Sequence, residues 1–374
     1  MPPPDDTAAP LAPPPRGGPW PPAGGLPDPA LTRAQLLETV AAIKAAQQPC
    51  GTLPWPDGHT DAWDHVECAM ALVVGGELGA ARKAYDWLAG TQAPDGSWAT
   101  SWDQLRVLDA TVDVNQCAYV AVGVWQWWLE TGDRSLVDTM WPVVRRALDL
   151  VLRMQAPEGH VHWSRGPEGD VRHDGLLTGS SSMYQSLRCG IALGELVGDA
   201  QPDWELAAGQ LQHAVAHHPE VFLDKSRFSM DWYYPVLGGC LRGEAGQAQL
   251  ASRWEEFVVP GYGIRCVADR PWVTGAETAE LVLALVALGD DDRARRLLSE
   301  VQHLRHDDGS YWTGLVFDEG VRWPGERSSW TSAAMVLAAD ALAGGTSRAL
   351  FTGDDLPTGV LLTSCAYEPC TARG

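Results

Sequence analysis

Two short acidic segments carry the side chains best suited to acid–base chemistry. In the first, Asp61, Asp64 and His65 follow the i, i+3, i+4 spacing that places side chains on one helix face. Trp63 adds an aromatic surface at the same place. Asp61 is equally suited to cap the helix, and Asp64 to stabilise its first turn through the helix dipole. The segment therefore predicts either a capped helix start or half of a catalytic carboxylate pair.

The second acidic segment places Glu277 near the start of a nearly apolar run. One interpretation is a capping box, because Thr274 lies three residues earlier. The other is a general acid, since partial burial in a pocket mouth raises the pKa of a carboxyl group. Glu280 lies one turn further along the run and is expected deeper in the structure.

Aromatic side chains accompany carboxylates at further helix starts, where ordinary packing and capping are the alternative to a binding role. Flat aromatic faces stack on sugar rings, and carboxylates accept hydrogen bonds from hydroxyl groups. The chain has 18 Trp but only 5 Phe, a bias that favours a wet, sugar-lined groove over a dry cavity. The predicted substrate-binding residues are Trp63, Asp64, His65, Asp113, Asp231, Trp232, Tyr234, Trp272, Arg327 and Trp330.

The polar clusters open alternate helical runs, and this arrangement predicts the fold. Apolar periodicity and breakers predict helices over residues 31–47, 61–76, 78–92, 112–131, 134–155, 179–197, 203–218, 230–242, 244–257, 274–288, 290–303 and 329–343. Runs that begin with a cluster are apolar on nearly all sides, as buried helices are, whereas their partners keep a polar face. Six such hairpins predict an all-α (α/α)6 barrel, a closed ring that gathers the clusters into one pocket.

Recurrent turn sequences support the hairpins. Gly76-Glu77, Gly132-Asp133 and Gly289-Asp290 each have the pattern of a helix C-cap followed by an N-cap. A second repeat, in residues 92–98, 155–159 and 305–311, follows outer helices with a glycine turn, and in the first and last an aromatic residue is expected to fold back on the helix end. Short runs near residues 160–163 and 311–317 predict small hairpins in loops.

Composition limits the possible partners. The 374-residue chain is 45% hydrophobic and has a formal net charge of -21, so binding to nucleic acid or to an anionic membrane through a basic surface is excluded. Anionic substrates would need a local basic pocket or a metal, whereas neutral substrates would not. No signal sequence or membrane-spanning run is evident, which predicts a cytoplasmic protein with reduced thiols.

Composition also divides the chain into three parts. Residues 1–29 are rich in Pro, Gly and Ala and predict a disordered arm. Residues 30–345 predict the barrel, and residues 346–374 predict a loose C-terminal tail. Four of the cysteines, at positions 68, 117, 189 and 240, fall within apolar runs and are expected to be buried and unpaired.

Several of these segments resemble known families. The turn repeat resembles the QW motifs of terpene cyclases and protein prenyltransferases, but the Asp-x-Asp-Asp acid motif of class II cyclases is missing from the predicted inner helix starts. Residues 129–149 and 174–180 resemble six-hairpin glycosidases such as the glucoamylase-type enzymes. The whole region from about 32 to 343 resembles an actinobacterial family commonly labelled "prenyltransferase", that of the mycobacterial methylmannose polysaccharide hydrolases.

The last resemblance implies an activity and its catalytic residues. It implies an endo-α-1,4-mannosidase whose acids lie at Asp61, in His59-Thr60-Asp61, and at Glu277, in Gly275-Ala276-Glu277. In the resulting hypothesis Glu277 is the general acid and Asp61 the general base of an inverting hydrolysis, with carboxyl groups ~6.5–9.5 Å apart. Asp64 is a rival to Asp61.

This hypothesis needs no metal or cofactor, and its partner is an oligo- or polysaccharide. An isoprenoid enzyme and a non-catalytic glycan-binding toroid are the alternatives. The residues by themselves leave open the sugar, its methylation, endo or exo action and the oligomeric state.

Overall fold

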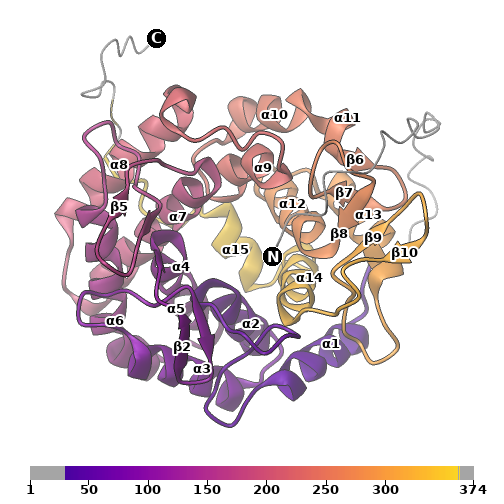
Figure 1. Cartoon of the computed structure of the whole chain (residues 1–374), viewed down its shortest axis with the longest axis horizontal. Helices are drawn as coiled ribbons and strands as arrows, with labels where there is room; N and C mark the ends of the chain where they lie inside the picture. Colours follow the sequence, from indigo (N-terminus) through magenta and orange to yellow (C-terminus); the bar gives the residue numbers. More distant parts are fainter. Residues whose placement is uncertain (1–29, 361, 363–374) are drawn as a thin grey trace.

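A ring of inner helices forms the centre of the computed structural model, which describes residues 30–360 and residue 362. Within this part, α2, α5, α7, α9, α12 and α14 each contact the next, and α14 contacts α2 again (Figure 1). Their bounds, with the short α4 that precedes α5, are α2 Ala62–Val74, α4 Val114–Ala118, α5 Val120–Thr131, α7 Leu177–Val197, α9 Ser229–Leu237, α12 Gly275–Ala287 and α14 Ser329–Leu342. The predicted (α/α)6 barrel is confirmed.

An outer layer of helices surrounds this ring and packs on it. The outer helices are α1 Arg33–Ala46, α3 Leu78–Thr91, α6 Arg134–Arg153, α8 Pro202–His217, α10 Gly243–Ser252 with α11 Trp254–Phe257, and α13 Asp291–Glu300. Short 3-10 turns, η1 Pro219–Val221 and η2 Val301–Leu304, follow α8 and α13. Because α1 packs on α14, the two ends of the barrel sequence meet and close the ring.

The glycine turns after the outer helices join each outer helix to the next. Gln92 ends α3, and its Nε2 donates to the carbonyls of Gly96, 3.0 Å away, and of Val143 on α6, 2.9 Å away. Gln155 makes the equivalent pair of bonds after α6, to Gly159 and to Ala207 on α8. These bonds explain the predicted repeat in structural terms. A Cβ on Gly96 would lie 2.0 Å from the backbone oxygen of Arg146, so only glycine fits this contact.

The same pair of glutamine hydrogen bonds occurs after α1, at a turn that the sequence repeat did not include. Gln47 Nε2 donates to Gly51 O at 3.0 Å and to Ala80 O on α3 at 2.9 Å. At the other end of the chain, Thr39 Oγ1 on α1 donates to Gly309 O at 2.8 Å. The turn at Gly309 therefore completes the outer layer where the chain ends meet.

Three helix predictions need correction, and the first is the run 244–257, which divides into α10 and α11 at Arg253. The run 112–131 is not one helix, because Asp113 caps the short α4 and Val122 N bonds to Tyr119 O, three residues back, where α5 begins. The run 230–242 ends at Leu237, since Gly239 takes a positive φ of 91° that a helix cannot continue. The predicted cap at Gly132-Asp133 is confirmed, with Gly132 left-handed and Asp133 accepting from Ser135 N.

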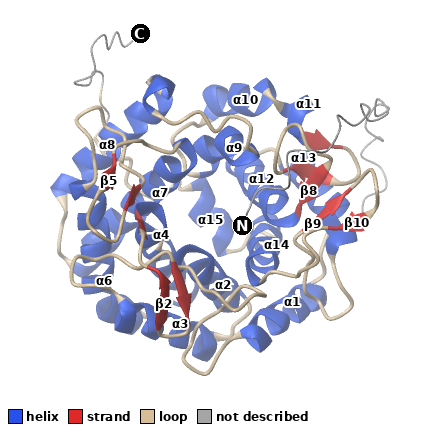
Figure 2. Ribbon diagram, in the orientation of Figure 1, coloured by secondary structure: helices blue, strands red, loops and turns tan. Residues whose placement is uncertain are grey.

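Short antiparallel strands lie in the loops outside the inner ring (Figure 2). They form a hairpin of β1 Ser101–Asp103 and β2 Arg106–Asp109, and a three-stranded sheet of β3 Val112–Asp113, β4 Ser164–Arg165 and β5 Val171–Arg172. A five-stranded sheet has the order β10-β9-β8-β7-β6, with β6 Val258–Val259, β7 Gly263–Arg265, β8 Trp272–Thr274, β9 Gly314–Val316 and β10 Val321–Arg322. β3 and β8 lead directly into α4 and α12, so these sheets fix two helix starts.

The prediction of a loose tail from residue 346 is wrong for its first part. Thr346–Thr352 form α15, which packs on α5, α12 and α14 and lies behind the ring in Figure 1. Burial of Leu350 and Phe351 supplies the reason, because the far end of the ring would otherwise expose its apolar interior. The predicted arm 1–29 and most of the tail after 360 lie outside the described residues.

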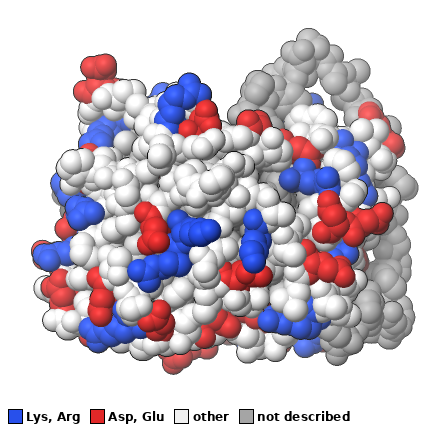
Figure 3. Space-filling model, turned by 90° about the horizontal axis from the view of Figure 1, so that it is seen from below, with Lys and Arg blue, Asp and Glu red and all other residues white. Residues whose placement is uncertain are grey.

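The outer surface mixes both signs of charge. Lys and Arg alternate with Asp and Glu on the face shown in Figure 3, and many form pairs such as Arg134–Asp138 and Arg82–Asp86. Cys68, Cys117, Cys189 and Cys240 are buried and free, as predicted. Among the described helices, none is both long and apolar enough to cross a bilayer.

Arg188 on α7 is expected to hold the segment after α15 in place. Its guanidinium donates to the carbonyls of Gly353, Leu356 and Pro357 at 2.8–2.9 Å. Arg188→Met should lower the free energy of unfolding by about 2–3 kcal/mol, because bonds from a charged donor are lost and buried carbonyls remain unpaired. Urea denaturation and faster hydrogen exchange in residues 353–360 would measure this.

Arg134→Met is the matched control, because Arg134 is exposed and pairs only with Asp138 across one helical turn. It should change stability by no more than about 0.5 kcal/mol. Equal effects of the two substitutions would contradict the anchoring role of Arg188.

Candidate active site

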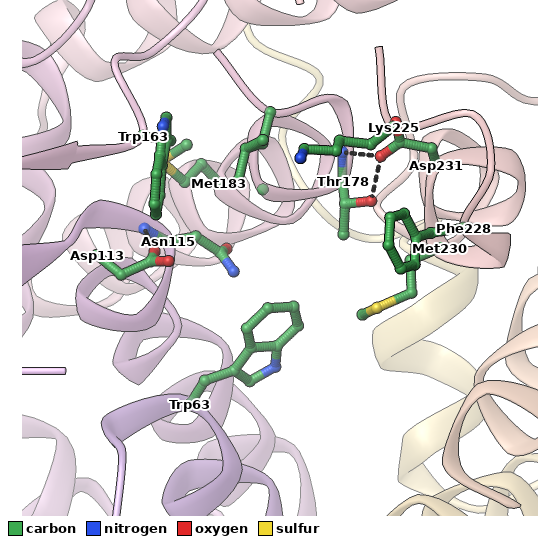
Figure 4. Close-up of a pocket in the computed structure, with 12 residues that line it drawn as sticks. Trp63, Asp113, Asn115, Trp163, Thr178, Met183, Lys225, Phe228, Met230 and Asp231 are labelled. Atoms are coloured by element: carbon green, nitrogen blue, oxygen red, sulfur yellow. Dashed lines mark hydrogen bonds between the residues drawn. The ribbon is translucent and has the colours of Figure 1, made fainter. Parts of the chain in front are cut away.

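The starts of four inner helices converge on one cavity. The cavity has a volume of about 330 Å³ and is bounded by the first residues of α2, α4, α7 and α9 and by adjoining loops (Figure 4). Its lining residues are Trp63, Asp113, Asn115, Trp163, Leu176, Thr178, Gly179, Met183, Lys225, Phe228, Met230 and Asp231. The predicted gathering of polar clusters at one mouth is therefore present for these helices.

Asp61 and Asp64 form a close pair at the start of α2. Asp61 is the N-cap, with Oδ1 accepting from Asp64 N at 2.9 Å. The Trp55 indole N–H faces both carboxyl groups, 3.1 Å from Asp61 Oδ2 and 2.7 Å from Asp64 Oδ2. Asp61 can therefore cap the helix and still take part in chemistry, because Oδ1 caps the helix while Oδ2 faces Trp55.

The shared environment changes the protonation of this pair. Burial, followed by the negative charge of Asp61 beside it, raises the pKa of Asp64 well above its ordinary value, and the Trp55 N–H opposes the rise.

Glu277 lies in the first turn of α12 and is 6% exposed. The predicted capping box is wrong, because the Thr274 side chain makes no capping hydrogen bond to the helix. Instead, the Cys266 thiol faces Glu277, and burial together with the charge of Glu277 raises the pKa of that thiol well above its ordinary value. The Glu277 carboxyl group is therefore not part of a capping box at the start of α12.

A deeper acid, Glu280, lies one turn further along α12, as the sequence predicted. Tyr234 donates a hydrogen bond to Glu280 Oε1 at 2.6 Å, and Tyr233 donates to Oε2. Burial raises the pKa of Glu280 to about 8, although both tyrosines oppose the rise, and the charge of Glu277 adds to it. Glu280 is therefore largely protonated at neutral pH.

Glu67 is the acid that the sequence analysis missed. Burial, followed by the charge of Glu280, raises the pKa of Glu67 well above its ordinary value, while the Trp330 indole opposes the rise. The signal was available, because Asp61, Asp64 and Glu67 repeat every three residues along one side of α2. The carboxyl groups of Glu67 on α2 and Glu280 on α12 are therefore close enough for the charge of Glu280 to raise the pKa of Glu67.

Asp113 and Asp231 line the cavity on the other side of Trp63, as predicted. Asp113 caps α4, and burial raises its pKa to about 6 against the opposing backbone N–H groups, with a further contribution from the charge of Asp61. Asp231 accepts from Thr178 Oγ1 at 2.6 Å, a bond drawn in Figure 4, and burial raises its pKa.

Aromatic side chains lie beside these acids in two groups of ring contacts. The Trp63 ring lies 5.6 Å from that of Tyr119 and 5.8 Å from that of Tyr234, in an edge-to-face arrangement with the latter. Trp55 lies 5.9 Å from Trp330. Trp63, Tyr234 and Trp330 thus lie beside the acids, and their proposed contact with substrate stays a prediction.

Two predicted binding residues instead support the fold. His65 is fully buried, with Nδ1 accepting from Leu53 N at 3.1 Å and Nε2 facing Ala84 O at 3.0 Å. Trp232 is also buried, donates to the backbone of α10 and stacks on Phe257. Both predictions were wrong, because these side chains point from inner helices toward the outer layer.

Arg327 and Trp272 also lie away from the cavity. Arg327 donates to Asp308 and Ser310 and lines a separate hollow that Trp55 also lines, so its predicted contact with substrate stays a prediction. Trp272 donates from Nε1 to Trp323 O at 2.7 Å within the five-stranded sheet. In the described part of the chain, no three His, Cys, Asp or Glu side chains are arranged to hold a metal ion.

Comparison with solved structures identifies the fold. A glycosidase solved with glucose superposes with a TM-score of 0.66 over 83% of this chain and 98% of that one, at 16% identity. A bacterial glucoamylase complexed with acarbose gives 0.64 over 85% and 57% at 13% identity, and a D-mannose isomerase gives 0.64 over 83% and 97% at 11%. At such identities the likeness concerns the fold, that of the six-hairpin glycosidases.

Sequence similarity identifies the family within this class. No family model matches the chain. It is 57% identical over 332 residues, 88% of this chain and 92% of the relative, to the MMP endo-(1,4)-3-O-methyl-alpha-D-mannosidase of Mycolicibacterium hassiacum. The chain belongs to the family of this mannosidase and is a glycoside hydrolase.

The raised pKa of Glu280 makes a prediction about stability. The folded protein keeps this proton between pH 4.5, the ordinary value, and about 8, so raising the pH through this window removes stability. In Glu280→Gln this loss should disappear. The free energy of unfolding of the variant relative to that of the wild type should therefore rise from pH 5 to pH 8, by at most about 1.4 kcal/mol per pH unit. Urea denaturation at each pH measures this difference.

Glu168→Gln, at an exposed site, is the control and should follow the wild type at every pH. A constant offset between Glu280→Gln and wild type over this range would show that Glu280 does not hold a proton in the folded protein.

Proposed function

We propose that this protein hydrolyses internal α-1,4-mannosidic bonds of a 3-O-methylmannose polysaccharide. The observation that carries the proposal is the 57% identity to a relative whose name states this activity. The carboxyl groups of α2 and α12 supply the groups that glycoside hydrolysis requires, namely one proton donor and one acceptor.

In the proposed reaction, Glu277 donates its proton to the glycosidic oxygen as the bond to the anomeric carbon breaks. A water molecule attacks the opposite face of the sugar ring, and its proton passes to the Asp61–Asp64 pair. Asp61 is the proposed acceptor because burial raises the pKa of Asp64 well above its ordinary value, and the Trp55 N–H contacts both carboxyl groups. Because water attacks directly, the reaction inverts the anomeric centre.

Electrostatics favour a neutral substrate over the isoprenoid alternative. Asp113 and Asp231 line the cavity, and Lys225 is the cation among its lining residues. A diphosphate would meet negative charge there at close range. A neutral glycan would instead find hydrogen-bond acceptors and aromatic faces.

Activity on α-1,4-oligomannosides tests the assigned roles. Glu277→Gln and Asp61→Asn should each lower kcat by about 10²–10⁴-fold, because proton transfer to or from the reacting atoms is lost. On α-mannosyl fluoride, whose leaving group needs no protonation, Glu277→Gln should recover activity and Asp61→Asn should not. The kcat of Asp64→Asn is compared with that of Asp61→Asn, and the larger loss identifies the carboxyl group that accepts the proton.

Glu168→Gln is the exposed control and should keep the wild-type rate. Intact oligomannosides together with consumed farnesyl or geranylgeranyl diphosphate would replace the proposal with an isoprenoid enzyme. Binding of glycan without turnover in the wild type would indicate a non-catalytic toroid.

The configuration of the first product tests the inverting course. Hydrolysis of an α-linked mannoside should initially release the β-anomer, which proton NMR resolves before mutarotation mixes the two forms. Initial release of the α-anomer would show retention and would require one of the carboxyl groups to attack carbon directly.

A further inference from the structure

The cavity beside the acid pair has an apolar wall that the catalytic step does not use. Trp163 and Met183 form one side, and Phe228 and Met230 form the other (Figure 4). The Met230 side chain reaches toward Trp63, which is only two residues from Asp61 in the chain. The wall therefore begins beside Trp63, two residues after Asp61.

A buried amide at the same cavity lacks a partner in the protein. Asn115 is 5% exposed, and its Oδ1 makes no hydrogen bond within the structure. Figure 4 shows the amide directed into the space above Trp63. A buried polar atom without a partner costs about 1–3 kcal/mol, so its retention here points to a hydrogen bond completed by a ligand.

The other polar groups are positioned at the cavity's edges. Thr178 holds Asp231 on one side, and the backbone N–H groups of α4 hold Asp113 on the other. Fixed acceptors such as these suit the hydroxyl groups of a sugar. Between them the lining is thioether and aromatic, which offers nothing to a hydroxyl group.

We infer that this cavity is the subsite that selects an O-methylated sugar, with Asn115 binding a ring hydroxyl and Met230 contacting the methoxy group. The inference rests on the proposed function. A volume of about 330 Å³ is at the small end of the range for ligand pockets and suits a single sugar unit rather than a length of chain.

Physical chemistry explains why the wall favours the methylated ring. A hydroxyl group placed against Met230 and Phe228 would lose its hydrogen bonds to water without replacement. A methyl ether there instead removes apolar surface from water, and a single methyl-sized difference gives a selectivity of about 10–200-fold. Methionine adapts its shape to an irregular group, and aromatic rings pack flat against it.

The test is the ratio of kcat/KM for 3-O-methylated and plain α-1,4-oligomannosides of equal length. Wild type should prefer the methylated substrate by about 10-fold or more. Met230→Gln, which keeps the side-chain length but adds a polar amide, should lower this preference by about 10-fold, and Met230→Leu should restore most of it. Asn115→Ala should raise KM for both substrates, because it binds a hydroxyl common to them.

Leu206→Gln, the same kind of change at an exposed site on α8, is the control and should leave both rates unchanged. A wild type that cleaves both substrates equally, or a Met230→Gln variant that loses activity on both equally, would overturn the inference while the proposed function stands. A wild type that cleaves neither would overturn the proposed function itself. If Met230→Gln fails to fold, binding of 3-O-methylmannose against mannose to Glu277→Gln, measured by calorimetry, decides whether the subsite prefers the methylated sugar.

Discussion

Closure of the helical ring is the constraint on which the other features depend. Inner helices that are apolar on every side are stable only when neighbours cover them completely, and the outer layer supplies this cover. Side-chain hydrogen bonds from Gln47, Gln92 and Gln155 to backbone carbonyls tie α1 to α3, α3 to α6 and α6 to α8. The packing of α1 on α14 joins the ends, and α15 covers the far end, so only the mouth remains polar.

A closed ring also explains the chemistry of the mouth. Because α2 and α12 both pack on α14 in the ring, carboxyl groups that are far apart in sequence become neighbours in a buried interior. Burial, followed by repulsion between neighbouring carboxyl groups, raises the pKa of Asp64, Glu67 and Glu280.

The sequence predicted the fold more reliably than the direction of individual side chains. Helix starts, hairpin caps and the glycine turns follow from local rules, and the barrel is confirmed, with Asp113 and Asp231 lining the cavity. His65 and Trp232 do not line it, because an inner helix has neighbours on all sides and spacing alone does not tell the inward face from the outward one. The spacing of Glu67 from Asp61 and Asp64 was visible in the sequence, but only the structure places Glu67 near Glu280 of α12.

The amino-acid sequence by itself determined the periodicity of the helices, their caps and the apolar character of the inner layer, since these depend on residues within a few positions of one another. Tertiary structure alone decided which acids face each other, because the distance between α2 and α12 is fixed by ring closure and not by spacing. It also decided that Asn115, Met230 and Trp63 share one cavity, although they come from three separate helices. The chemistry of this protein therefore depends on contacts that only the closed ring creates.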